Sequence, residues 1–178
     1  MSAEPSRGPD RDLEARSRDV RARFLSQVPP TAGALSTLSR VDYEDAFVVE
    51  NGRAQDRTAE QWARAIFEDA PMRRRVPLRW AWLAQGLKLG SARSDRLVFG
   101  WELRRSTPDF ALLGADSRIG MPAEILFMRQ QDSLLVAVFV QYDNHIARAV
   151  WAGVRPVHRR SSPFIASSGV ARFVRRTE

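Results

Sequence analysis

The chain has 178 residues and no cysteine, which excludes disulfides, thiolate nucleophiles and zinc–thiolate sites. A hydrophobic fraction of 44% and five tryptophans are typical of one globular domain with its own core, not of a disordered chain. The formal net charge is +7, but every basic residue except Lys88 is arginine, a bias that GC-rich codon usage explains better than a nucleic-acid surface does.

The N-terminal region divides into a tail and the start of a domain. Residues 1–12 are rich in proline, serine and charge, and we expect a disordered tail ahead of a single domain over 13–178. Apolar residues at helical spacing over 13–28, followed by two prolines, predict an N-terminal helix. No secretory signal is present, and the longest apolar run, 134–140, is too short to cross a bilayer. We therefore expect a cytoplasmic protein without a membrane span.

The next segments predict one strand and then helices. Residues 40–50 carry the β-branched and aromatic residues of a strand. Residues 57–71 predict a helix, with Thr58 as the N-cap and Gln61 completing a capping box. Residues 75–90 predict a second helix or a pair of short helices.

From residue 96 onward the apolar period changes to two, which indicates strands. The run 134–142 is apolar on both faces, as expected for a strand covered on both sides. Residues 156–176 have the signals of a long C-terminal helix. The expected strands are 96–105, 109–115, 123–130, 134–142 and 146–154.

This order of elements predicts an α+β fold. We expect a curved antiparallel sheet of about six strands that grips a long C-terminal helix, with two helices after the first strand. The space between sheet and helix must be filled by side chains or must hold a ligand. The residues that we expect to bind a ligand there are Trp101, Leu103, Phe110, Leu112, Phe127, Phe139, Gln141, Arg148 and Val150.

The segment "GVRPVHRRSSPF", 153–164, is expected to end the last strand, turn and begin the terminal helix. In that position His158 would fasten the turn by hydrogen bonds, or would act as an acid, base or ligand contact at the cavity mouth. A catalytic triad with Ser161 or Ser162 is formally possible, but no nucleophile elbow supports it. His145 and His158 do not match a metal-ligand spacing, so we expect no metal.

Charged residues on predicted strands supply the other candidates. By strict alternation Arg148 lies on an apolar face, where a guanidinium must be paired or must meet a ligand anion. A salt bridge with Glu124 or Glu102 is one interpretation, and a clamp for a carboxylate or enolate is the other. The candidate catalytic residues are therefore Arg148, His158 and Glu124.

Four stretches carry a resemblance to a known family: "DYEDAF" (42–47), "RTAEQWARAIFEDAP" (57–71), "GWELRRSTPDFALLGADSRIGMPAEILF" (100–127) and "RAVWAGVRPVHRRSSPF" (148–164). The chain resembles the helix-grip fold of the START and polyketide-cyclase superfamily (SRPBCC), and more locally an uncharacterised bacterial branch of unknown function. The resemblance implies a deep cavity between sheet and C-terminal helix. Members bind sterols, lipids, polyketides or hormones there, and some catalyse cyclisation, dehydration or aromatisation without a cofactor. It supplies no catalytic residues for this chain.

Three functions stay open. The first is binding of an apolar lipid-, polyketide- or ring-like small molecule without a cofactor. The second is a cofactor-free cyclase, dehydratase or lyase of a natural-product pathway in the same cavity. The third is an interaction module whose cavity is filled by its own Trp and Phe side chains. Apart from these functions, a homodimer also stays open. Titratable groups converging in the cavity would favour an enzyme, and an apolar lining would favour binding. The arginine clusters lack stacking aromatics beside them, which does not favour nucleic-acid binding.

Overall fold

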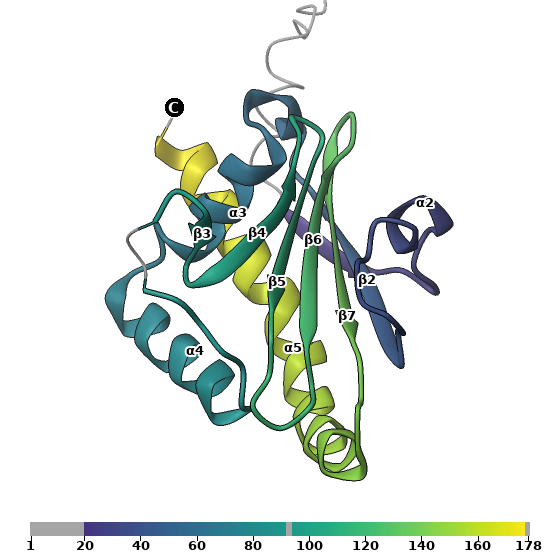
Figure 1. Cartoon of the computed structure of the whole chain (residues 1–178). Helices are drawn as coiled ribbons and strands as arrows, with labels where there is room; N and C mark the ends of the chain where they lie inside the picture. Colours follow the sequence, from purple (N-terminus) through teal and green to yellow (C-terminus); the bar gives the residue numbers. More distant parts are fainter. Residues whose placement is uncertain (1–19, 92–93, 177–178) are drawn as a thin grey trace, which may run out of the picture.

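An antiparallel sheet curves around a long C-terminal helix in the computed structural model, which describes residues 20–91 and 94–176 (Figure 1). This arrangement confirms the predicted α+β helix-grip fold. The described strands, in spatial order, are β1 (Arg21–Phe24), β2 (Tyr43–Glu50), β7 (Ser133–Val140), β6 (Ala123–Arg129), β5 (Phe110–Ala115), β4 (Trp101–Ser106) and β3 (Leu97–Val98). The helices are α2 (Pro30–Gly33), the 3-10 turn η1 (Ala54–Asp56), α3 (Ala59–Phe67), α4 (Met72–Ala84) and α5 (His145–Arg176).

Both faces of the sheet are covered, as the two-faced apolar pattern of the central strand predicts. Along β7 one set of alternate side chains packs with α3 and α5, and the other set packs with α2 and its flanking loops. Burial on both faces explains why β7 reads as a nearly continuous apolar run. The first set is Leu134, Val136, Val138 and Val140, and the second is Leu135, Ala137 and Phe139.

Helix α3 fastens the terminal helix to the sheet. It begins with the predicted capping box, in which Thr58 and Gln61 exchange side-chain to backbone hydrogen bonds. Its buried face carries Ile66, against which Gly169 of α5 packs closely. A Cβ atom at position 169 would lie 2.7 Å from the Ile66 Cα atom, so only glycine permits this approach of the two helices.

The predicted last strand over 146–154 is wrong, because these residues form the first turns of α5. Asn144 caps the helix, since its Oδ1 accepts a hydrogen bond of 2.9 Å from the Ala147 N–H. Ala147 and Trp151 are buried four residues apart, which is a helical spacing. The segment 153–164 therefore lies inside a continuous helix and not at a strand-to-helix joint.

The predicted strand over 96–105 is interrupted by a tight turn. Phe99 has φ = 52° and Gly100 has φ = 93°, so the chain reverses and β3 pairs with β4 as a hairpin. A Cβ atom at position 100 would lie 2.5 Å from the Arg79 Nη1 atom and 2.9 Å from the Gly90 carbonyl oxygen. Glycine is thus required at the turn for space as well as for conformation.

The predicted N-terminal helix is wrong for its described part. Residues 21–24 form β1, which pairs antiparallel with β2 at the edge of the sheet. Phe24 packs edge-on against Phe47, with ring centroids 5.7 Å apart, and this contact anchors the added strand. The predicted tail, 1–12, and residues 13–19 lie outside the described residues.

Candidate functional site

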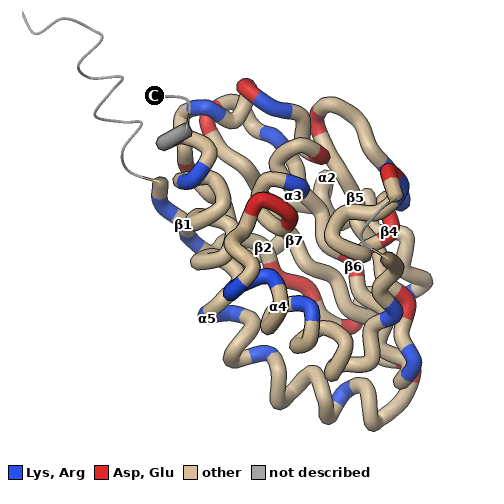
Figure 2. Tube along the Cα trace, turned by 90° about the vertical axis from the view of Figure 1, so that its left-hand side faces the viewer, with Lys and Arg blue, Asp and Glu red and all other residues tan. Residues whose placement is uncertain are grey.

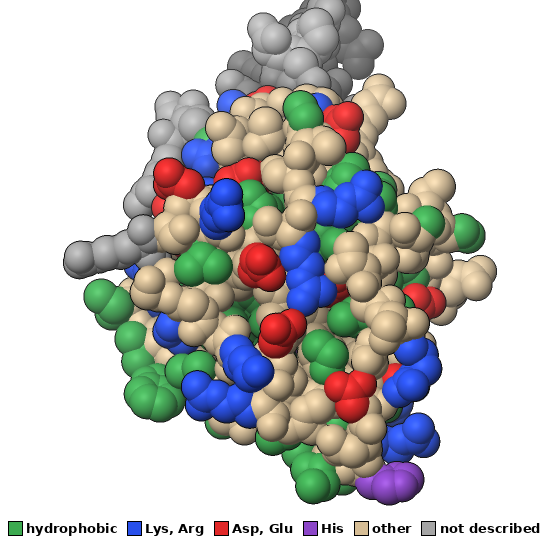
Figure 3. Space-filling model, viewed as in Figure 1, with side chains coloured by type: hydrophobic (Ala, Val, Ile, Leu, Met, Phe, Trp, Pro, Cys, Tyr) green, Lys and Arg blue, Asp and Glu red, His purple; other side chains and the backbone are tan. Residues whose placement is uncertain are grey.

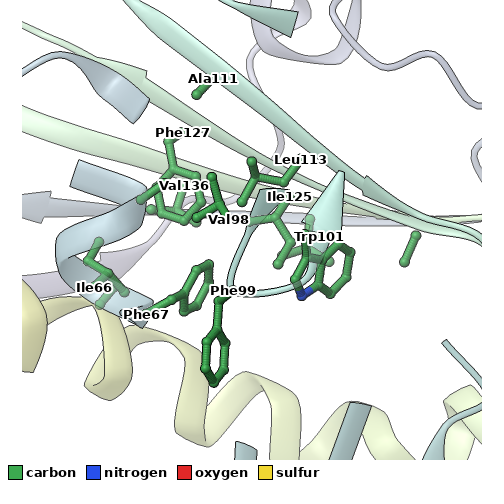
Figure 4. Close-up of a cluster of buried hydrophobic side chains, with 14 of the residues drawn as sticks. Ile66, Phe67, Val98, Phe99, Trp101, Ala111, Leu113, Ile125, Phe127 and Val136 are labelled. Carbon is green, nitrogen blue, oxygen red and sulfur yellow. The ribbon is translucent and has the colours of Figure 1, made fainter. Parts of the chain in front are cut away.

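A cavity of about 140 Å³ lies between the helix-covered face of the sheet and helices α3, α4 and α5. Figure 4 shows part of the surrounding apolar cluster, with sheet side chains directed toward Phe67, Phe99 and the ribbon of α5. An apolar cavity of about 150 Å³ in another protein stays free of water and holds benzene, so this volume suits one small ring. The lining from the sheet includes Phe47, Trp101, Ile125, Phe127, Val136 and Val138.

Helix α4 forms the most solvent-exposed wall of the cavity. None of its thirteen residues, all of them described, is buried. Trp82 contributes the main inward contact, with its ring edge-on to Trp101 at 5.2 Å between centroids. Arg79 ties the helix to the β3–β4 turn through hydrogen bonds to the Gly90 and Phe99 carbonyl oxygens. On the facing helix, Val157 lines the cavity and is 65% exposed, which places the opening between α4 and α5.

The α5 wall carries the polar part of the cavity. His158 Nδ1 lies 3.0 Å from Ser162 Oγ, and His158 Nε2 lies 3.3 Å from Asp45 Oδ2. Tyr43 donates a hydrogen bond of 2.6 Å to the same Asp45 oxygen. Burial, and then this bond to Asp45, raise the pKa of Tyr43 above its ordinary value. A continuous hydrogen-bonded chain thus runs from β2 to the Ser162 hydroxyl in the cavity lining.

His158 and Ser162 are among the residues that the sequence points to, whereas Asp45 and Tyr43 are not. The prediction that His158 fastens a turn is wrong, because His158 lies in the middle of helix α5. Its side chain is 14% exposed. The spacing of four residues between His158 and Ser162 becomes informative only when the segment is known to be helical. Alternation in β2 places Tyr43 and Asp45 on the face that also carries Phe47, which is a signal in the sequence.

The predicted ligand-binding residues separate between the two faces of the sheet. Trp101 and Phe127 line the cavity. Phe110, Leu112 and Phe139 pack instead on the opposite face, with the loops around α2. Both faces are apolar, so alternation groups these residues without showing which group meets the helices.

Three more of these residues lie outside the cavity lining. Leu103 and Val150 pack at the edge of the same core. Gln141 belongs to a surface network, where its Oε1 accepts from the Ser39 hydroxyl and its Nε2 donates to Asp143. The polar groups of Gln141 are therefore used in holding the loop before β2.

Two of the three catalytic candidates do not face the cavity. Glu124 is fully buried on the opposite face, where its carboxylate accepts from Ser36 Oγ (2.6 Å), the Thr37 N–H (3.0 Å) and Arg104 Nη1 (2.8 Å). Arg148 lies on the exposed side of α5, with its guanidinium 5.8 Å from the centre of the Tyr142 ring. The carboxylates predicted to pair with Arg148 are paired with Arg104 instead.

Charge is mixed over the described surface. Figure 2 shows basic positions along α4 and α5, which contain no Asp or Glu, and acidic positions on other elements, and Figure 3 shows the two signs interspersed on one face. Several guanidinium groups lie over the chain's own aromatic rings, as Arg75 does over Phe99 and Arg159 over Phe24. None of the helices in residues 20–91 and 94–176 is both long and apolar enough to cross a membrane.

Comparisons with known proteins leave the site to be argued from its geometry. No protein-family model matches the chain, and no curated protein matches it. Among solved structures, a protein of unknown function from Pseudomonas aeruginosa aligns with 14% identity, over 82% of this chain and 81% of that chain, at a TM-score of 0.21. At that score the likeness carries no argument about function.

Proposed function

We propose that the protein binds a small apolar molecule, about the size of one aromatic ring, in the cavity between the sheet and helices α3, α4 and α5. The observation that carries the proposal is a cavity of about 140 Å³ with an almost wholly apolar lining and an opening between α4 and α5. A ligand of about seven heavy atoms at up to ~1 kcal/mol per atom would bind with a dissociation constant on the order of 10–100 µM.

Binding is favoured over catalysis by the placement of the candidate residues. Of Arg148, His158 and Glu124, His158 alone contributes to the cavity lining. The second titratable group that acid–base chemistry would need is not among the lining residues, which supports a binding protein. The aromatic side chains also leave the cavity open, which does not favour an interaction module with a filled core.

The order of elements supports the proposed kinship with the START and polyketide-cyclase superfamily. A strand (β2), two helices (α3 and α4), five antiparallel strands (β3 to β7) and a terminal helix (α5) follow one another as the helix-grip fold requires. In that superfamily the corresponding cavity holds apolar ligands, which agrees with the function proposed here.

The proposal is tested by filling the cavity. Val138 lines the cavity from β7, so Val138→Phe should occupy much of its volume and abolish the binding of toluene measured by calorimetry. Val41→Phe makes the same substitution at an exposed residue before β2 and should leave toluene binding unchanged. Failure of the wild-type protein to bind toluene, or equal binding by Val138→Phe, would contradict the proposal.

A further inference from the structure

The cavity has one polar end, and its hydrogen-bonding direction can be worked out from the partners. The lining is apolar except where α5 contributes His158, Ser161 and Ser162 and where Gln85 follows the end of α4. Of these, Ser162 is connected through His158 to Asp45 and Tyr43 on β2. The direction of each bond in this chain decides what Ser162 offers to a ligand.

The hydrogen-bonded chain starts from Asp45, whose carboxylate only accepts hydrogen bonds. Tyr43 keeps its proton, because its pKa is raised, and donates to Asp45 Oδ2. His158 Nε2, 3.3 Å from the same oxygen, must then carry a hydrogen to form its bond. In neutral imidazole this leaves Nδ1 as an acceptor, so the Ser162 hydroxyl donates to Nδ1 across 3.0 Å. The remaining lone pairs of Ser162 Oγ are free to accept.

We propose that Ser162 Oγ accepts a hydrogen bond from a hydroxyl group of the ligand, so that the cavity selects a small ring compound with a hydroxyl over the hydrocarbon and over the ether. The inference rests on the proposed function. The ring occupies the apolar part of the cavity beside Trp101 and Phe127, and the hydroxyl lies at the α5 wall. A phenol or a small alicyclic alcohol has this shape and chemistry.

The experiment compares three probes that differ at one group: toluene, p-cresol and 4-methylanisole. Dissociation constants are measured by calorimetry at about pH 9. The wild-type protein should bind p-cresol about threefold to tenfold more tightly than toluene, as one hydrogen bond allows, and should show no such gain for the ether. Ser162→Ala should remove the preference for p-cresol and leave the affinity for toluene unchanged.

Two further variants distinguish Ser162 from its surroundings. Ser161 also lines the cavity, but its hydroxyl donates to the His158 carbonyl oxygen, so Ser161→Ala should keep the preference. Asp45→Asn should reverse the direction of the hydrogen bonds that run from residue 45 through His158 to Ser162. The amide N–H would donate to His158 Nε2, Nδ1–H would donate to Ser162, and the Ser162 hydroxyl would be free to donate. This variant should therefore prefer 4-methylanisole to toluene.

The outcomes separate the two proposals. Absence of toluene and p-cresol binding to the wild-type protein would overturn the proposed function and this inference with it. Equal binding of toluene and p-cresol, or a preference that survives in Ser162→Ala, would overturn the inference and leave the cavity as an apolar binding site.

Discussion

Glu124 is predicted to stabilise the fold and not to contribute to ligand binding, and Glu124→Gln tests this. The carboxylate is fully buried and joins three segments, because Ser36 and Thr37 of the loop before β2 and Arg104 of β4 all donate to it. Glutamine keeps the volume of the side chain but removes its charge and one acceptor oxygen. The substitution therefore weakens these bonds without creating a cavity.

The magnitude follows from the bonds that lose the charge. A hydrogen bond to a charged group contributes about 1.5–3 kcal/mol and a neutral one about 1 kcal/mol. In the variant the bond from the Thr37 N–H loses its charged acceptor, and the bond from Arg104 keeps only the charge of its donor. We expect the free energy of unfolding to fall by about 2–3 kcal/mol, which for a chain of this size lowers Tm by roughly 5–10 °C.

Urea unfolding followed by tryptophan fluorescence measures the change, with Glu102→Gln as the matched control. Glu102 lies 3.9 Å from the same Arg104, but its side chain is 67% exposed, so the control should lose less than about 0.5 kcal/mol. Equal stability of the two variants would refute the reasoning. Glu124→Gln should still bind toluene as the wild type does, since Glu124 lies on the face opposite the cavity.

Three further predictions concern α5 and β2. Gly153→Ala should raise the free energy of unfolding by about 0.5–1 kcal/mol, because the site is exposed and helical with open space around its Cβ position. Gly169→Ala should lower the free energy of unfolding by about 1–3 kcal/mol, because the new methyl group would clash with the Ile66 backbone; urea unfolding that gave the opposite order would contradict the packing of α5 on α3. Because the pKa of Tyr43 is raised in the folded protein, its contribution to stability is complete below the unfolded-state pKa of about 10 and is lost progressively as the pH rises from there toward the higher folded-state pKa. The stability of wild type relative to Tyr43→Phe should therefore fall by about 1 kcal/mol between about pH 9 and pH 11, and an unchanged difference in urea titrations would show that Tyr43 is not held protonated.

The central strand of the sheet could be predicted from the sequence, because a strand that is buried on both faces is apolar at nearly every position. The run that became β7 is apolar at nearly every position, and a strand at the centre of a covered sheet requires this. Because both faces of the sheet are apolar, the sequence does not show which face lines the cavity. Phe127 and Phe139 are equally apolar. Phe127 lines the cavity because α3 and α5 pack on its face of the sheet, whereas Phe139 lies on the other face.

Residues 146–154 are open to two interpretations, which explains why the sequence predicts a strand where α5 begins. The alternation of Ile146, Arg148 and Val150 fits a strand, while Ala147 and Trp151 fit a helix. Asn144 decides between them as an N-cap, although asparagine is equally common in turns.

The polar chain could not be predicted from sequence, because its central contact joins residues 113 apart. His158 meets Asp45 only after β2 has paired with β7 and α5 has packed across the sheet. Pattern analysis can place each residue on a face of its own element, but the meeting of two elements depends on the whole fold.

The measurement that tests the cavity most directly is methyl NMR of the wild-type protein during titration with toluene. We expect saturable shifts for the methyl groups of Ile125, Val136 and Val138, which line the cavity, and unchanged positions for those of Leu126 and Leu135 on the opposite face. Shifts confined to the opposite face or to the exposed surface, or no saturable shift at all, would contradict it.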